Sequence, residues 1–384
     1  MNPLHHRHRL HVLTAAALAM SVTACQSLPS SARKAEGERH WNQVRGRVKL
    51  QLAVQQFQSG QFDESIRTAT ESVALDPSNP AHYCLLARAN LELSRPASAA
   101  QALAAADRAG ARSPDLLYTE GVILEQQDRL EAALEKFSQA LAQDQNRLDY
   151  FVAQIECLIG LNRFDEARRL LEERTADFDD RGALAALAAH VARLLGDDAE
   201  AVRQYRRAVS AYPGNRLIAE ELGLLLVQEG SFAEAVPLLK QLVSAKGGDE
   251  ASGAVRRGLA ESYLALGDSE SAVGTLADYV VAHPRDSLAQ LLLAKAAIDE
   301  GDLGRALRAI DLAHREQPNQ PEVLFVKALL EWKRGDLLIA AADLAAVLDR
   351  NPDDADAQRL QTEIRRIQSL TATQNSDPAS RVGD

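Results

Sequence analysis

In this chain of 384 residues, four histidines cluster at residues 5–11, and beyond residue 24 the histidines and cysteines, which could do chemistry, are spread singly. Its three cysteines are Cys25, Cys84 and Cys157, and neither C-x-x-C nor H-x-x-x-H occurs, so the spacings typical of zinc sites are absent. Gly247-Gly248 lacks the Lys and Ser/Thr of a phosphate-binding loop. We therefore expect no catalytic residue, no cofactor, no metal and no enzyme activity. An enzyme with a site built across several parts of the chain stays open as a weaker alternative.

Cys25 is the one cysteine in a recognisable setting. A basic start with Arg7 and Arg9 precedes the apolar stretch Val12–Met20, which is too short to span a bilayer, and the motif Val22-Thr23-Ala24-Cys25 follows. This order is typical of a secretory signal peptide, and its end resembles the lipobox of bacterial lipoproteins. The resemblance implies that residues 1–24 are removed and that Cys25 carries the lipid, palmitate included, that anchors the chain to a membrane. The alternative is an ordinary secretory signal followed by a chance cysteine.

Residues 25–40 are polar and contain Pro29 and several serines, a composition that predicts a flexible tether. Gln26, rather than Asp, follows the cysteine, and in enterobacterial lipoproteins that resemblance implies transfer to the outer membrane. We expect the chain in the bacterial cell envelope, lipid-anchored on the periplasmic face of the outer membrane. The inner membrane stays open.

The charge balance excludes several classes of ligand. Removal of residues 1–24 takes away two arginines and leaves 41 Lys and Arg against 54 Asp and Glu, a net charge of −13. Such an acidic chain argues against nucleic acid, or anionic lipid, as a broad ligand. No small-molecule substrate is expected, and no other run of eighteen apolar residues offers a membrane span.

A 34-residue period organises the chain. Small or turn-forming residues recur at this step, with three extra residues, Glu250–Ser252, inserted once. The turn positions are Gly60, Ser94, Asp128, Asn162, Gly196, Gly230, Gly267, Gly301 and Gly335. Five residues after each turn stands a small residue: Ser65, Ala99, Ala133, Ala167, Ala201, Ala235, Ala272, Ala306 and Ala340. A small side chain at a fixed position predicts the close approach of two helices.

This pattern resembles the tetratricopeptide repeat family, whose helix-turn-helix unit has 34 residues, over about four fifths of the chain. The resemblance implies an all-α, right-handed superhelical solenoid of about nine repeats at 41–354, a capping helix at 355–370 and a disordered tail at 371–384. The insertion Glu250–Ser252 is either a longer loop or a hinge. Cys84 and Cys157 lie two repeats apart, too far for a disulfide, and are predicted to be small buried hydrophobes.

The resemblance also implies that a protein or peptide partner binds in a concave groove lined by the first helix of each repeat. The candidate groove residues are Arg88, Tyr118, Glu125, Glu156, His190, Arg193, Glu220, Arg257, Glu261, Lys295, Phe325 and Trp332. Each is also compatible with an ordinary solvated helix face. Tyr118 and Trp332 are the predicted anchors because aromatic residues are enriched among binding hot spots, although either could serve packing instead.

The expected function is that of a membrane-anchored periplasmic scaffold for protein–protein interactions in envelope complex assembly, in pilus, secretion or outer-membrane machinery. Repeat lipoproteins of those systems have a similar make-up but shorter arrays. The alternative is a regulator or cofactor of a cell-wall or exopolysaccharide enzyme.

Overall fold

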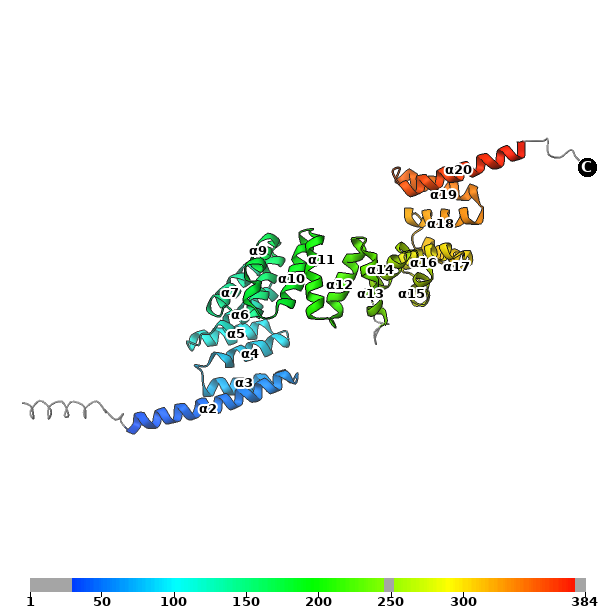
Figure 1. Ribbon diagram of the computed structural model, residues 1–384. Coiled ribbons are helices and arrows are strands. Elements are labelled where there is room, and N and C mark those ends of the chain that lie inside the picture. Colours follow the sequence, from blue (N-terminus) through cyan, green and yellow to red (C-terminus); the bar gives the residue numbers. More distant parts are fainter. Residues whose placement is uncertain (1–29, 245–251, 377–384) are drawn as a thin grey trace, which may run out of the picture. The chain divides into compact units, whose positions relative to one another are not determined.

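The computed structural model describes residues 30–244 and 252–376, and all regular structure within these ranges is helical. The predicted signal peptide, Cys25 and the first two residues of the three-residue insertion lie outside the described residues. Within each of the two compact units described below, helices that follow one another along the chain pack against each other (Figure 1). The prediction of an all-α repeat solenoid is confirmed.

The chain divides into two compact units, and each is described by itself. Unit 1 ends at Arg163 and unit 2 begins at Phe164. Unit 1 contains α2 (Ser30–Gln58), α3 (Phe62–Leu75), α4 (Pro80–Glu92), α5 (Pro96–Arg108), α6 (Pro114–Gln126), α7 (Leu130–Gln143) and α8 (Leu148–Gly160).

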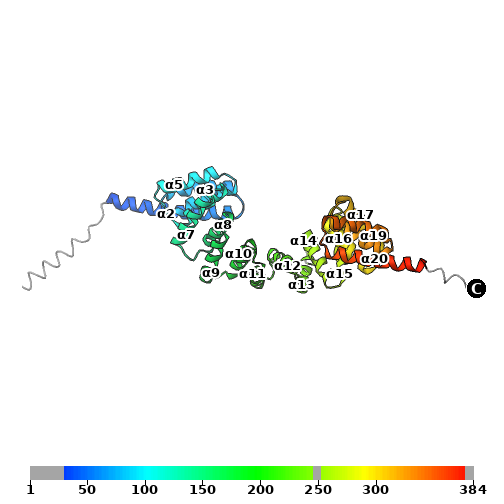
Figure 2. The same cartoon turned by 90° about the horizontal axis from the view of Figure 1, so that it is seen from above.

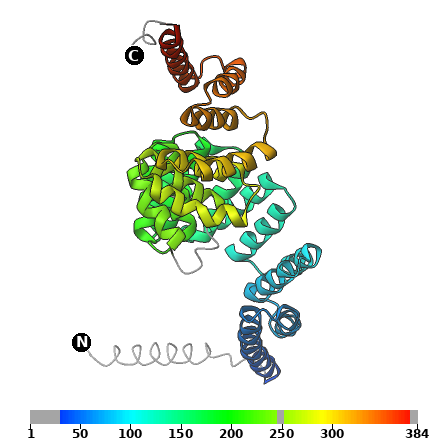
Figure 3. The same cartoon turned by 90° about the vertical axis from the view of Figure 1, so that its right-hand side faces the viewer.

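Unit 2 continues with the same alternation of first and second helices (Figures 2 and 3). It contains α9 (Phe164–Arg174), the short 3-10 helix η1 (Thr175–Asp177), α10 (Arg181–Leu194), α11 (Asp198–Ala211), α12 (Arg216–Gln228), α13 (Phe232–Ser244), α14 (Gly253–Ala265), α15 (Ser269–Ala282), α16 (Ser287–Glu300), α17 (Leu303–Glu316), α18 (Pro321–Arg334), α19 (Leu337–Arg350) and α20 (Ala355–Ser376). The last helix, α20, packs on α19 and α18.

All nine predicted turn residues adopt the left-handed backbone conformation. The six glycines have φ between 73° and 89°, and Ser94, Asp128 and Asn162 have φ of 54°, 59° and 57°. A left-handed residue is a common way to end a helix, and glycine accepts it without the steric cost of a Cβ atom. Short polar side chains tolerate it better than other types. The turn spacing read from the sequence therefore fixes where each first helix ends.

The small residues five positions after the turns are all fully buried, with 0% of their surface exposed from Ser65 to Ala340. Ser65 shows why a small side chain is needed, since its hydroxyl donates to the carbonyl of Ala53 on the facing helix at 2.9 Å. Large side chains then fill the space between hairpins, and Phe137, Leu239 and Leu276 are likewise fully buried. The buried side chains form several small clusters along unit 1, whereas most of those in unit 2 belong to one large cluster.

Two predictions about chain ends differ from the structure. Residues 30–40, expected to be part of a flexible tether, form the N-terminal part of α2, and residues 371–376, expected in the disordered tail, extend α20. The tether prediction weighed only the lack of apolar residues. The segment Ala32–Arg39 is rich in Ala, Arg, Lys and Glu, which are strong helix formers, so it continues the helix that begins the first repeat.

The inserted segment ends in an ordered cap. Ser252 is the N-cap of α14, and its Oγ accepts a hydrogen bond from the Val255 N–H at 3.2 Å. The same hydroxyl donates to Glu220 of α12 at 2.5 Å. Glu250 and Ala251 lie outside the described residues, so the choice between loop and hinge stays a prediction.

Candidate functional site

A cleft of about 530 Å³ lies on the first helices of unit 1. Helices α2, α4 and α6 are neighbours, and the N-terminus of α8 closes one end of the lining. The lining side chains are Leu50 and Val54 of α2; Ala81, Cys84, Leu85, Arg88, Leu91 and Glu92 of α4; Asp115, Tyr118, Thr119, Val122 and Gln126 of α6; and Arg147 and Asp149 at the start of α8. Aliphatic side chains thus alternate with charged ones along the cleft.

Two predicted groove residues, Arg88 and Tyr118, line this cleft. The Arg88 side chain is exposed, and its guanidinium carbon lies 5.4 Å from the centroid of the Phe57 ring. Tyr118 is half-buried: its ring stacks on Tyr150 at 5.0 Å and packs at a tilt against Phe137 at 5.4 Å. Burial, followed by the charge of Asp149, raises the pKa of Tyr118. Tyr118 therefore presents one edge to the cleft and uses the rest of its ring for packing.

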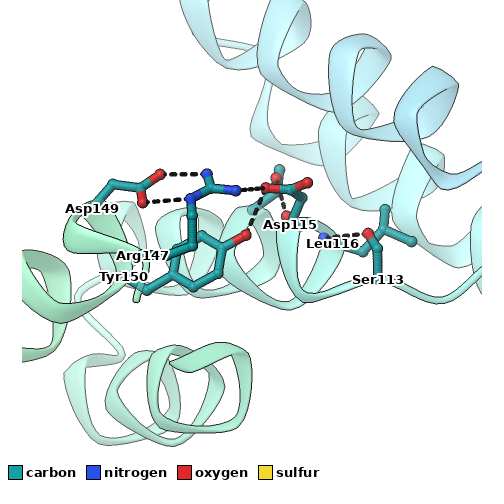
Figure 4. Close-up of polar contacts among 7 residues, drawn as sticks. Ser113, Asp115, Leu116, Arg147, Asp149 and Tyr150 are labelled. Atoms are coloured by element: carbon teal, nitrogen blue, oxygen red, sulfur yellow. Dashed lines mark hydrogen bonds and ion pairs between the residues drawn. The ribbon is translucent and has the colours of Figure 1, made fainter. Parts of the chain in front are cut away.

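A network of charged groups forms the end of the cleft at α8 (Figure 4). Arg147 binds Asp149 with two parallel hydrogen bonds, from Nε at 3.0 Å and from Nη2 at 2.8 Å, and its Nη1 lies 3.2 Å from Asp115 Oδ1. The Tyr150 hydroxyl donates to the same Asp115 oxygen at 2.6 Å, and Arg147 lies 4.5 Å above the Tyr150 ring. Two-point arginine–carboxylate pairing is geometrically specific, so this rim is well ordered.

The repeat register explains why Arg147 is available for this network. Ser113 stands 34 residues earlier at the N-cap of α6, where its Oγ accepts from the Leu116 N–H at 3.2 Å. Arg147 is the N-cap residue of α8, and its side chain makes no cap hydrogen bond there. The guanidinium is instead directed to Asp115 and Asp149, which are themselves 34 residues apart. The fourth repeat thus replaces a helix cap by a charged bridge between two repeats.

The two cysteines in this unit are free and buried, as predicted. Burial, and then the charge of Asp115, raises the pKa of the Cys84 thiol to about 11, and burial followed by Glu125 raises that of Cys157 to about 12. The thiolate is the reactive form of cysteine, so both side chains are poor nucleophiles at neutral pH. The cleft therefore offers binding contacts rather than cysteine chemistry.

Two further predicted groove residues, Glu125 of α6 and Glu156 of α8, interact electrostatically with each other. Burial, followed by repulsion from Glu156, raises the pKa of Glu125, and burial raises that of Glu156. Each carboxylate is therefore less favourable in the folded chain than in water.

In unit 2, several of the predicted groove residues are engaged within the chain. Arg193 pairs with Glu221, Arg257 pairs with Asp286, and Glu220 accepts the Ser252 bond described above. Asp286 also caps α16 by accepting from the Ala289 N–H at 3.1 Å. Among the remaining positions, His190 and Glu261 are exposed, and Lys295 and Phe325 are half-buried.

The second predicted anchor, Trp332 of α18, is half-buried against the last core cluster, which includes Leu344 and Ile364. The Lys333 ammonium lies 4.8 Å from its ring centroid. Packing occupies much of this ring, and its role as a partner contact stays a prediction.

The network residues Asp115, Arg147 and Asp149 were not among the predicted groove residues. The signal that could have found them is the recurrence of aspartate at one position of two successive repeats, with an arginine where the previous repeat has a capping serine. Across residues 30–244 and 252–376, no group of three or more His, Cys, Asp or Glu side chains is arranged to hold a metal ion. In the same ranges no helix has the length and apolar character needed to cross a bilayer.

Comparison with protein families identifies tetratricopeptide repeats along the chain. One repeat model matches residues 50–114, 186–254 and 325–367, and a second matches residues 124–191 and 226–296. The matches cover both units.

Among curated proteins, the chain is similar to the cellulose synthase operon protein C of Xanthomonas axonopodis pv. citri, with 29% identity over 246 residues, 60% of this chain and 16% of that protein. It is 27% identical over 240 residues to the cellulose synthase 2 operon protein C of Komagataeibacter xylinus, which covers 61% of this chain and 18% of that protein. The chain thus spans less than a fifth of the length of these relatives.

Two solved structures illustrate the structural similarities found. They include the C-terminal part of a tetratricopeptide repeat protein from Cytophaga hutchinsonii, with 17% identity, a TM-score of 0.47 and coverage of 63% of this chain and 98% of that one. The type IV pilus biogenesis factor PilW has 14% identity and a TM-score of 0.39 and covers 64% of this chain and 97% of that one.

Proposed function

The chain belongs to the tetratricopeptide repeat family, and from that premise we propose that it is a protein-binding scaffold whose unit 1 cleft holds an extended segment of a partner protein. The cleft carries this proposal: three neighbouring first helices leave about 530 Å³ of space lined by aliphatic side chains and the exposed Arg88. Pockets of this size bind through apolar contacts, with a few polar groups that fix orientation.

The charges along the cleft define the chemistry of the segment. Arg147 is paired with both Asp115 and Asp149, so this end of the lining offers fixed geometry and a net charge of −1. Arg88 is the cation that a ligand carboxylate would meet, beside Leu85 and Val122. The proposed ligand is therefore a peptide segment with an aliphatic side chain next to an acidic group.

Two settings are proposed for this scaffold. The first is assembly of an envelope complex such as a pilus, secretion or outer-membrane machine, as the lipoprotein-like N-terminus suggests. The second is regulation of an exopolysaccharide enzyme, which the names of the similar curated proteins favour. In both, lipid on Cys25 would hold the chain at the periplasmic face of the outer membrane. A weaker alternative is an enzyme site assembled across repeats.

Site-specific crosslinking in cells tests the binding proposal. A photo-reactive residue at Gln126, in the cleft, should give a defined crosslinked partner, whereas one at Arg308, exposed on α17, should not. Arg88→Glu should abolish the Gln126 crosslink, and Arg308→Glu, which makes the same charge change, should leave it intact. A crosslink pattern that is the same for both variants would contradict the cleft as the binding site.

The membrane address has its own test. Cell fractionation should find the native chain with outer membranes and the Cys25→Ser variant in the soluble periplasmic fraction or retained as precursor. Mass spectrometry of the mature N-terminus should show Cys25 with attached acyl chains. An unmodified Cys25 on the mature protein would refute the anchor without affecting the cleft.

A further inference from the structure

Helix α2 has two apolar faces. One face, with Leu50, Ala53 and Phe57, packs in the first core cluster of unit 1. The other face carries Trp41, Val48 and Leu52, whose exposed fractions are 62%, 61% and 47%. At 100° per residue, positions 41, 48 and 52 fall within roughly 40° of one another around the helix. Three large apolar side chains therefore form a continuous exposed stripe.

The repeat register shows that this stripe is unusual. The residues at the position of Val48 in the next three repeats are His82, Leu116 and Tyr150, and all three are buried. In those repeats the preceding hairpin covers that face of the first helix. Among the described residues no hairpin precedes α2, and its N-terminal part extends past α3 (Figures 1 and 2). The equivalent face of the first helix is therefore buried in the next three repeats and exposed in the first repeat.

The charge of this segment is opposite to that of the chain. Residues 30–49 contain six Lys and Arg against two Glu, a net of +4, whereas the whole chain has a net charge of −11. At 100° per residue Lys34 lies at the edge of the stripe in line with Leu52, Arg45 lies about 20° beyond that edge, and Arg47 lies about 100° from the opposite edge. All three are exposed. An apolar stripe with a tryptophan, flanked by basic residues, is the pattern of helices that lie in a membrane interface.

We propose that residues 30–52 of α2 dock on an anionic lipid surface, with Trp41, Val48 and Leu52 inserted at the level of the headgroups. Lys34, Arg45 and Arg47 then lie against lipid phosphates, each of which attracts a basic side chain close to the surface. The acidic remainder of the chain is repelled by the same surface, so the contact is confined to this helix. The negative charge of the rest of the chain therefore opposes its binding to the anionic surface and favours the orientation in which α2 faces the lipid. The proposal does not require lipid on Cys25.

Vesicle binding of the full chain with Cys25→Ser, which has no lipid anchor, tests this inference. Flotation with phosphatidylcholine vesicles that contain one third phosphatidylglycerol should recover the chain, and vesicles of phosphatidylcholine alone should not. The triple variant Lys34→Glu, Arg45→Glu, Arg47→Glu should reduce binding at least about 100-fold. The matched control is the triple variant Arg350→Glu, Arg359→Glu, Arg365→Glu in α19 and α20, exposed positions far along the chain, which should bind like the parent.

Tryptophan fluorescence gives a second readout, because Trp41 and Trp332 are the two tryptophans of the chain. In a Trp332→Phe background, emission should shift to the blue with anionic vesicles and return when salt is raised. Equal recovery with both vesicle types, or equal losses for both triple variants, would overturn the proposal. A blue shift that depends on protein concentration without lipid would assign the stripe to a second copy and would also overturn it.

Discussion

The first helices of unit 1 and of unit 2 use their charged side chains in different ways. In unit 2, Arg257 pairs with Asp286, which also caps a helix and accepts the Tyr279 hydroxyl at 2.9 Å. In unit 1, Arg88 lies over an aromatic ring at the edge of the cleft, and Glu125 and Glu156 repel each other. The same helix-turn-helix unit thus pairs an arginine such as Arg257 within the chain in one case and leaves Arg88 exposed in the other. The repeat pattern alone does not distinguish these two uses.

The sharpest test of this contrast compares two aspartates that each bind an arginine and a tyrosine. Asp286 has a side chain only 15% exposed, whereas that of Asp115 is 52% exposed. Asp286→Ala leaves the half-buried guanidinium of Arg257 unpaired and removes a helix cap, so it should lower the unfolding free energy by about 2–3 kcal/mol. Asp115→Ala should cost about 1 kcal/mol or less because water replaces its contacts. Urea titrations followed by circular dichroism measure both, and equal losses would break the comparison.

Packing supplies the next largest difference. A Cβ on Gly121 of unit 1 would lie 2.5 Å from Cε1 and 2.7 Å from Cδ1 of the Phe137 ring, whereas one on Gly223 of unit 2 would lie 2.5 Å from Leu239 Cδ2. A buried ring cannot turn aside, but a leucine methyl can. Gly121→Ala should therefore cost about 1–3 kcal/mol. Gly223→Ala should cost less, because the atom in the way is the terminal methyl of a leucine, whereas the preference of a helix for alanine, about 1 kcal/mol, acts equally at both positions. Thermal unfolding of the two variants measures this difference. A larger loss of stability for Gly223→Ala than for Gly121→Ala would contradict the prediction.

Substitutions of Arg147 should change the unfolding free energy less than the substitutions above, but they separate two roles of one position. Arg147→Ala breaks the bridge to Asp115 and Asp149 and should lower the unfolding free energy by about 1 kcal/mol. Arg147→Ser breaks the same bridge but restores the capping residue found at Ser113, which recovers about 1 kcal/mol. Stability should therefore separate the two variants, while partner crosslinking from Gln126 should weaken in both. If serine destabilises as much as alanine, the exchange of cap for bridge is wrong.

The smallest expected effect is the pH dependence, which should have opposite signs for the two sets of carboxyls. Burial first, and mutual repulsion next, raise the pKa of Glu125 above its ordinary value of 4.5, and burial raises that of Glu156, so the folded chain binds more protons there than the unfolded chain. These two ionised carboxylates therefore lower the unfolding free energy at neutral pH. The loss is relieved as the pH falls through the raised pKa values toward 4.5.

Asp286 behaves in the opposite sense. Burial alone would raise its pKa, but bonds from Ala289, Tyr279 and Arg257 outweigh burial and lower the pKa below 3.8. Asp286 therefore stabilises the folded chain at pH values above 3.8. This stabilisation is lost as the pH falls through the lowered pKa of Asp286. Glu156→Gln should therefore raise the melting temperature slightly at neutral pH and lose that advantage in mild acid, while Asp286→Asn should lower it most at neutral pH. Melting curves across this pH range would refute the assignment if Glu156→Gln were destabilising at neutral pH.

The hairpin plan follows from the sequence because the same physical requirement recurs in every period. A left-handed turn residue and a small contact residue are needed wherever two helices reverse and approach closely, and all nine predicted turn positions meet that requirement. Within the predicted tether, residues 30–40 are helical because Ala32–Arg39 consists mostly of strong helix formers. The intrinsic helix propensity of these residues favours the helix there, although residues 33–40 are exposed.

The candidate site was predicted less fully. Arg88 and Tyr118 line the cleft, but the sequence does not reveal which charges pair across repeats, because that depends on the reach and rotamer of each side chain. Arg257 and Arg193 have the same residue type as Arg88, yet each has a carboxylate partner one repeat away. Arg147 occupies a helix N-cap position, where the sequence does not indicate an ion pair between repeats.

The 34-residue interval between the left-handed residues, which is broken once between Gly230 and Gly267, has a consequence for how such a gene changes length. An unequal exchange between two successive turns, such as Asp128 and Asn162, deletes or duplicates one whole hairpin and joins residues that already suit each other. Each new neighbour then meets a contact surface of the kind it lost, because repeats interact mainly with adjacent repeats. Recombination can therefore lengthen or shorten the array in whole steps, while a cut elsewhere in the period would put the two halves out of phase.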